Sequence, residues 1–195
     1  MISFSGVSKA FDGREVLREI DWEIEPDCPV AVLGNSGSGK TTLLNLLTGL
    51  IKPDKGSITG TKGLLASMVF QEDRLLPWLT AKQNIDVVAQ KGRTRSEELL
   101  TALELSQDGD KYPEELSGGM KRRVAVARAL NFESGLLLLD EPFKGLDRDL
   151  KQKAMELVAS RLKGRCFVLV THDHEEADFL SERQYTIQEK KLVQV

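Results

Sequence analysis

The stretch that decides the fold is residues 29–42, which read PVAVLGNSGSGKTT. Its first five residues are apolar without interruption, which is typical of a short strand that is buried on both faces. A glycine-rich loop follows at once, and leucines at helical spacing then continue over residues 42–50. A buried strand, a glycine loop and a helix in this order favour a loop that holds phosphate groups.

The residue types of this loop suit a triphosphate. Backbone amides reach the closely spaced phosphate oxygens only where no side chain intervenes, and glycines permit that approach. The N-terminus of the following helix adds a favourable dipole. Lys40 would place its ammonium against the β- and γ-phosphates, and the Thr41 hydroxyl suits Mg²⁺. The predicted phosphate contacts are Gly34, Asn35, Ser36, Gly37, Ser38, Gly39, Lys40, Thr41 and Thr42.

Two carboxylates follow a second apolar run, at residues 136–139. The carboxyl end of a buried strand is the edge at which α/β sheets bind ligands. We expect Asp140 to hold Mg²⁺, directly or through water, and Glu141 to polarise an attacking water as general base or positioning group. An acidic strand end is common in isolation, but the phosphate loop requires an acidic partner.

A third motif, LSGGM at residues 116–120, opens a helix with an apolar stripe. Ser117 is a suitable N-cap residue, and Gly118 and Gly119 at the helix start make a second anion site. Because the chain already has a phosphate loop, a second phosphate site suggests a phosphate that belongs to a second molecule. The alternative is an N-capped helix with no further role.

Composition and length set the class of protein. The chain has 195 residues, of which 29% are charged and 41% hydrophobic, as in ordinary globular proteins, and we expect one domain over residues 1–195. The net charge of −3 does not indicate a nucleic-acid binder. No apolar stretch approaches the roughly 18–20 residues that cross a bilayer, and the N-terminus does not resemble a signal peptide. We therefore expect a cytoplasmic protein whose link to a membrane comes from a partner.

Periodicity predicts the remaining elements. Ile20, Trp22 and Ile24 alternate with acidic residues, which marks a half-buried strand, and Phe4 and Val7 indicate another strand before it. The chain should therefore open with a small antiparallel sheet. Core strands are expected at residues 67–70, 136–139 and 166–170, helices at 94–103 and 150–162, and a hairpin at 185–193. Strands that alternate with helices imply a mainly parallel α/β sheet.

Together, these motifs resemble the nucleotide-binding subunit of an ATP-binding-cassette (ABC) transporter, because the LSGGM segment separates that branch from other P-loop proteins. The resemblance implies an α/β P-loop NTPase fold of the ABC type. This fold has a mainly parallel core sheet, a small N-terminal antiparallel sheet and a short helical subdomain at about residues 72–128. It also implies ATP and Mg²⁺ as cofactors, and ATP hydrolysis coupled to transport. A head-to-tail homodimer would place Ser117, Gly118 and Gly119 against the ATP of the partner.

The same resemblance implies roles for four more residues. Gln71 would touch Mg²⁺ and water, and His172 would contact the γ-phosphate and hold the catalytic groups together. Asp147 lies in a loop that would cross the dimer interface. Phe11 would stack on adenine, although an aromatic residue there could equally pack into the small sheet.

Residues 69–78, VFQEDRLLPW, resemble the importers of nitrate, sulfonate and taurine type, and so do LSGGM and Asp140-Glu141-Pro142-Phe143. In the family this segment docks the membrane permease, and Leu75, Leu76 and Trp78 would suit a docking surface. The alternative is that these side chains pack on the helical subdomain. Alternative functions are an ABC exporter or lipoprotein-release ATPase, and a non-transport ABC ATPase. Members of the last class carry long coiled coils, for which the chain has no heptads.

Overall fold

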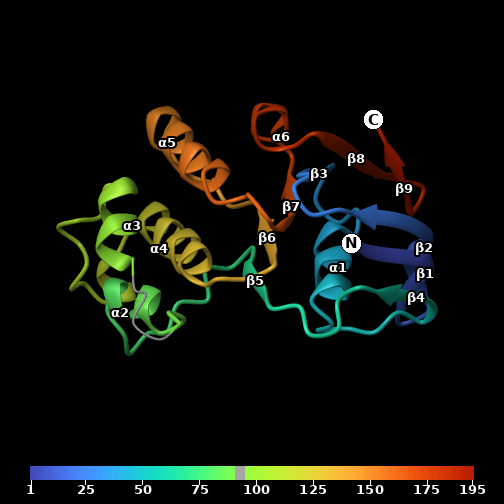
Figure 1. Cartoon of the computed structure of the whole chain (residues 1–195), viewed down its shortest axis with the longest axis horizontal. Coiled ribbons are helices and arrows are strands. Elements are labelled where there is room, and N and C mark those ends of the chain that lie inside the picture. Colours follow the sequence, from blue (N-terminus) through green and yellow to red (C-terminus); the bar gives the residue numbers. More distant parts are fainter. Residues whose placement is uncertain (91–94) are drawn as a thin grey trace. The chain divides into compact units, whose positions relative to one another are not determined.

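The N-terminal part of the chain forms a three-stranded antiparallel sheet in the order β2-β1-β4 (Figure 1). The computed structural model describes residues 1–90 and 95–195. In it β1 spans Ile2–Phe11, β2 Arg14–Ile24 and β4 Lys55–Thr59. The alternating residues of β2 are buried as expected, which confirms the small N-terminal sheet. β4 was not predicted from the sequence, because its residues are mostly polar and exposed.

The second sheet has six strands in the order β5-β6-β7-β3-β8-β9. These strands are β3 (Val30–Leu33), β5 (Ala66–Val69), β6 (Leu136–Asp140), β7 (Cys166–Thr171), β8 (Arg183–Gln188) and β9 (Lys191–Gln194). β3 runs parallel to both β7 and β8, and β9 runs antiparallel to β8. All residues of β3, β6 and β7 are buried, as their uninterrupted apolar sequences predict.

The structure changes one strand prediction and confirms another. A core strand was expected at residues 67–70, but β5 lies at the edge of the sheet and two of its four residues are not buried. The prediction of its burial was wrong, because apolar residues do not reveal how many neighbours a strand has. The predicted C-terminal hairpin is present, and Glu189 and Lys190 form its turn with φ of 47° and 70°.

Seven helical segments accompany the sheets in the described residues. They are α1 (Lys40–Leu47), α2 (Ala81–Asp86), α3 (Ser96–Ala102), a 3₁₀ turn (Pro113–Glu115), α4 (Gly118–Asn131), α5 (Arg148–Ala159) and α6 (His174–Leu180). α1 begins two residues earlier than expected. α5 buries Leu150, Ala154 and Val158, the face that the spacing predicts. Thr94, the first residue of the helix expected at residues 94–103, lies outside the described ranges, and α3 begins at Ser96.

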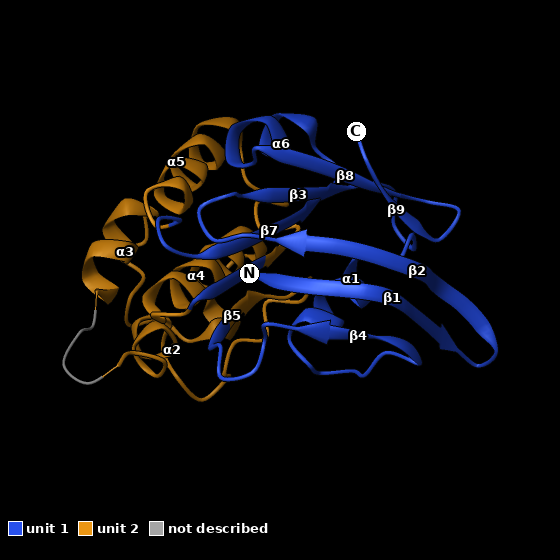
Figure 2. Cartoon of the chain, turned by 45° about the vertical axis from the view of Figure 1, so that its right-hand side comes forward, with its two compact units in different colours: residues 1–66, 135–138, 162–195 blue, residues 67–134, 139–161 orange. Residues whose placement is uncertain are grey.

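The chain packs as two compact units, which Figure 2 distinguishes by colour. The first unit consists of residues 1–66, 135–138 and 162–195, and the second of residues 67–134 and 139–161. The first unit contains the antiparallel sheet, β3 and α1, whose leucines 43, 44 and 47 are buried. The second unit contains α2, α3, α4 and α5. Within residues 1–90 and 95–195, none of the helices combines the length and apolar character that a membrane span requires.

Candidate functional site

The glycine-rich loop joins β3 to α1 in the first unit, and its conformation depends on glycine. Gly34, Gly37 and Gly39 have φ of 142°, 82° and 107°, which other residues rarely adopt. At Gly39 there is also no room for a side chain, because a Cβ atom would lie 3.0 Å from Cγ1 of Val16. The loop therefore needs a residue without a side chain at Gly39, where it enters α1.

Lys40 is the first residue of α1 and is buried against the loop rather than exposed at the surface. Its side-chain Nζ donates to the carbonyl oxygens of Gly34 at 2.6 Å and Asn35 at 2.8 Å, and the residue is 7% exposed. These bonds hold the ammonium inside the turn of the loop. The ammonium therefore provides a fixed positive charge among backbone groups, which suits a bound phosphate.

Two further observations test whether the loop fits a phosphate. Ser38 Oγ is buried and has no hydrogen-bond partner among the described residues, so a phosphate oxygen would supply the acceptor it lacks. Asn35, Ser36 and Thr41 are exposed, and Thr42 is half-buried. The loop thus offers hydroxyl groups and an ammonium together, and this donor set fits the phosphates of ATP.

His172 leaves the sheet at the same edge as the loop. β3 and β7 are parallel, and Leu33 pairs with Thr171. Gly34 and His172 are the next residues along their strands, so the structure brings the loop and His172 to the same edge. Contact of His172 with the γ-phosphate stays a prediction. His172 is exposed at this edge.

Phe11 ends β1 in the same unit. The residue is 45% exposed, and Lys9 Nζ lies 5.4 Å from the ring centroid. Such exposure leaves a ring face available for stacking, whereas a residue packed into the sheet would be buried. Stacking on adenine stays a prediction.

The predicted carboxylates lie at the end of β6, in the second unit. Asp140 is the last residue of β6 and is 2% exposed. Glu141 follows with φ of 49°, in the left-handed region that costs a glutamate conformational energy. Strained backbone of this kind is frequent at functional sites, where the surrounding structure holds it.

The second unit also brings the LSGGM segment and the loop of Asp147 together. Ser117 is the N-cap residue of α4, and its Oγ accepts from the Met120 amide at 3.3 Å. A Cβ atom on Gly119 would lie 3.4 Å from the Gly145 carbonyl oxygen, so the two loops are close neighbours. Asp147 is the N-cap residue of α5 and accepts from the Leu150 amide at 3.0 Å.

Gln71 follows β5 by two residues, and its backbone is held by a residue that the sequence analysis missed. Arg122 of α4 donates to the carbonyl oxygens of Phe70 and Gln71. The Gln71 residue itself is exposed. Arg122, Val126 and Ala129 share a helix face and all three are buried, but the sequence alone does not show what Arg122 contacts.

The three residues expected to dock a permease differ in exposure. Leu75 and Leu76 are half-buried. The backbone amide of Leu76 donates to the side-chain Oδ1 of Asn84 at 2.8 Å, and the side-chain Nδ2 of Asn84 donates to the Leu76 carbonyl at 3.1 Å. Trp78 is 69% exposed. The leucines therefore pack partly on the second unit, while the indole remains available to a partner.

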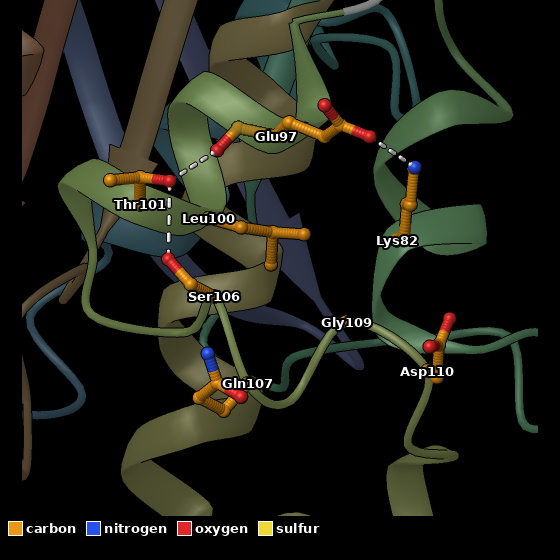
Figure 3. Close-up of a pocket in the computed structure, with 8 residues that line it drawn as sticks. All are labelled: Lys82, Glu97, Leu100, Thr101, Ser106, Gln107, Gly109 and Asp110. Atoms are coloured by element: carbon orange, nitrogen blue, oxygen red, sulfur yellow. Dashed lines mark hydrogen bonds and ion pairs between the residues drawn. The ribbon is translucent and has the colours of Figure 1, made fainter.

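A polar pocket of about 380 Å³ also lies in the second unit, among α2, α3 and the segment that follows α3 (Figure 3). Its lining residues are Lys82, Glu97, Leu100, Thr101, Ser106, Gln107, Gly109 and Asp110. None of the predicted site residues is among them. Lys82 Nζ donates to Glu97 Oε1 at 2.7 Å across the pocket wall. This pair raises the pKa of Lys82 and lowers the pKa of Glu97.

Comparisons with known proteins agree with this arrangement. The family model described as "ABC transporter" matches residues 17–144. The aliphatic sulfonates import ATP-binding protein SsuB 3 of Nocardia farcinica (strain IFM 10152) is 42% identical over 194 residues, which cover 97% of this chain and 77% of that protein. SsuB 1 of Rhodococcus jostii (strain RHA1), with the same description, is 42% identical over 185 residues, or 91% and 75% of the two chains.

The fold has a solved counterpart. The ATP-binding cassette MJ0796, in a dimeric post-hydrolysis state bound to ADP and Pi, matches with a TM-score of 0.88 and 29% identity. The match covers 98% of this chain and 96% of that chain, which confirms the predicted ABC-type cassette. Since the family model covers more than half of the sequence and close relatives span nearly all of it, the chain belongs to the ABC transporter family and is an ATPase of that family.

Proposed function

We propose that this chain binds and hydrolyses ATP to drive the import of a small sulfonate through a membrane permease. The observation that carries the proposal is the loop between β3 and α1, in which Lys40 Nζ lies against the Gly34 and Asn35 carbonyls. That loop supports ATP as the energy source. The direction of transport and the solute class rest on relatives named as aliphatic sulfonates import ATP-binding proteins.

The site residues divide into binding and chemical roles. The loop amides and Lys40 bind the phosphates, and Phe11 stacks on the adenine. Glu141 takes a proton from the attacking water or orients it, and His172 holds the γ-phosphate end. Thr41, Gln71 and Asp140 offer hydroxyl, amide and carboxylate oxygens, which are the ligands that Mg²⁺ prefers. When bound, Mg²⁺ would neutralise phosphate charge during hydrolysis.

A second copy of the chain completes each site in this proposal. Ser117 and Gly118 are exposed at the start of α4, where backbone amides favour an anion. The chain holds its own ATP at residues 34–42, so this second site serves the γ-phosphate of the partner in a head-to-tail dimer. Asp147, beside the same helix start, lies at the dimer interface. Residues 1–195 then work as one ATPase domain, with the helical subdomain at about residues 72–128.

The permease docks on the segment that contains Leu75, Leu76 and Trp78. A 69% exposed indole is a large apolar group to leave in water, and a protein partner would cover it. The chain would then sit on the cytoplasmic face of the cell membrane, held there by the permease.

Two measurements test the proposal in sequence. The purified chain should release phosphate from ATP only when Mg²⁺ is present, and failure to do so would remove the ATPase role. The tagged chain should then recover a multi-span permease from detergent-solubilised native membranes, identified by mass spectrometry. Recovery of soluble partners alone, with other permeases intact in the extract, would contradict the transport role.

The transported solute and the direction of transport are tested in cells. Deletion of the chain should abolish uptake of an isotope-labelled alkanesulfonate, and expression of the intact chain should restore it. Expression of the Glu141→Gln variant should not restore uptake. Unchanged uptake with impaired efflux of a lipid or lipoprotein would instead favour an exporter.

A further inference from the structure

The loop that carries Gln71 is held by two arginines of α4. Arg122 Nη1 donates to the Phe70 carbonyl at 2.6 Å, and Nη2 donates to the Gln71 carbonyl at 2.8 Å. Arg128 donates to the carbonyls of Asp73 at 3.0 Å and Arg74 at 2.9 Å. Four of the five carbonyls of residues 70–74 therefore accept hydrogen bonds from one helix.

Arg122 makes the more specific of these contacts. The residue is 4% exposed, and its two terminal nitrogens contact two consecutive backbone carbonyls, those of Phe70 and Gln71. Its Nη1 also lies 3.1 Å from Asp73 Oδ1. Burial raises the pKa of Asp73, while the positive charges of Arg122, Lys121 and Arg128 act in the opposite direction. A planar guanidinium can make these contacts at once, whereas an ammonium cannot.

The loop needs such support, because its own backbone is strained. Arg74 has φ of 45°, and its guanidinium lies over the Phe70 ring, 4.0 Å from the centroid. The chain therefore folds back on itself between Phe70 and Arg74. A conformation of this kind persists only where neighbouring groups hold it.

The same helix begins with Gly118 and Gly119 of the LSGGM segment, called the signature glycines below. α4 starts at Gly118, so Arg122 lies one helical turn after the segment proposed to contact the partner's γ-phosphate. We propose that Arg122 is a positioning residue that fixes the Gln71 loop to the start of α4, so that Gln71 and the signature glycines move together. This inference rests on the proposed function, in which Gln71 serves Mg²⁺ and the attacking water. In this proposal Arg122 makes no contact with ATP or Mg²⁺.

The inference predicts a loss in the chemical step rather than in ATP binding. The phosphate loop lies at residues 34–42, whereas the contacts of Arg122 are to residues 70, 71 and 73. Loss of the arginine should let Gln71 leave its place. The Mg²⁺ requirement should rise and kcat should fall, while the dissociation constant for ATP stays unchanged.

The test compares Arg122→Gln with Arg123→Gln in the full chain. Arg123 is the matched control, because on the same helix its guanidinium donates to other carbonyls, those of Leu103 at 2.6 Å, Glu104 at 3.1 Å and Gly119 at 3.4 Å. In Arg122→Gln, kcat should fall about 10-fold or more and half-saturating Mg²⁺ should rise severalfold, as for groups that orient metal ligands. Arg123→Gln should keep both values. Equal losses in the two variants would overturn the inference.

A lysine variant separates position from charge. Arg122→Lys keeps the positive charge but loses the pair of terminal nitrogens that contacts both carbonyls. It should therefore remain close to Arg122→Gln in kcat and in Mg²⁺ dependence. Full rescue by lysine would overturn the positioning role. If Arg122→Gln fails to fold by circular dichroism, Arg122→Lys carries the same comparison against Arg123→Lys.

Hydrogen exchange distinguishes failure of this inference from failure of the proposed function. The amides of residues 70–74 should exchange faster in Arg122→Lys than in Arg123→Lys, whether or not the chain hydrolyses ATP. A wild-type chain without ATPase activity would contradict the proposed function alone. Equal exchange in the two variants would contradict the role of Arg122 alone.

Discussion

Two loops of this chain, residues 34–39 and residues 70–74, obtain their shapes from different sources. The first is shaped by its own glycines and by Lys40, which follows it directly and donates back to its carbonyls. The second is held by Arg122 and Arg128, about 50 positions away in the sequence. A loop of the first kind can be recognised in the sequence, whereas a loop of the second kind needs the fold.

The largest effect is expected from a change that alters neither loop. Glu141→Gln should lower kcat by roughly 100- to 10,000-fold, the usual contribution of a general base, while ATP binding stays intact. The variant should also form a dimer with ATP in size-exclusion chromatography. Glu189→Gln is the matched control, because Glu189 has φ of 47° against 49° for Glu141. Normal turnover in Glu141→Gln would remove this carboxylate from the mechanism.

The role of the loop at residues 34–39 is tested most directly by a change at Lys40. Lys40→Ala should weaken ATP binding roughly 10- to 100-fold, since a hydrogen bond to a charged group contributes about 1.5–3 kcal/mol. Isothermal titration calorimetry with MgATP would measure the change. The exposed Lys62→Ala provides the control for loss of one positive charge. An unchanged affinity in Lys40→Ala would count against the assignment of the loop.

The contribution of glycine to the same loop can be separated into strain and crowding. Gly39→Ala should lower the free energy of unfolding by about 1–2 kcal/mol, because φ is 107° and the Cβ would lie 3.0 Å from Val16 Cγ1. Gly63→Ala shares a positive φ of 78° but has no atom within 4 Å of its Cβ, so it reports strain alone. Urea denaturation of both should show the larger loss at Gly39. Equal losses would mean that Val16 moves aside.

The smallest effect is expected at an ion pair that supports neither loop. Lys82→Met should leave the melting temperature and the ATPase rate unchanged at pH 7, because water screens its exposed contact with Glu97. The raised pKa of Lys82 favours the folded state until the pH exceeds that pKa, above 10.5. The lowered pKa of Glu97 favours the folded state at any pH above the ordinary pKa of a glutamate, 4.5. Both groups are thus charged at pH 7, and a clear loss there would show that the pair does more than its exposure implies.

The sequence was sufficient where structure depends on neighbours in the chain. The strand, loop and helix around Lys40 could be predicted, because glycine spacing and apolar periodicity act over a few residues. The end of β6 at Asp140 could be predicted for the same reason. The register of Leu33 with Thr171 supports the expectation that His172 lies near the loop.

Prediction failed where structure depends on distant residues. β5 was expected in the core, but its place at the sheet edge depends on the order in which strands pair. β4 was missed because a polar strand gives little periodic signal. Arg122 was missed because its partners Phe70 and Gln71 are 52 and 51 positions away, and the apolar stripe expected of this helix did not include it.

The left-handed backbone of Glu141 has a consequence for anyone who engineers this chain. Glycine would occupy φ of 49° without strain and would relieve roughly 1 kcal/mol, so a screen for thermal tolerance alone would favour it. That substitution would also delete the carboxylate proposed to activate water. Libraries of stabilised variants should therefore keep position 141 fixed, since resistance to heat and turnover of ATP oppose each other there.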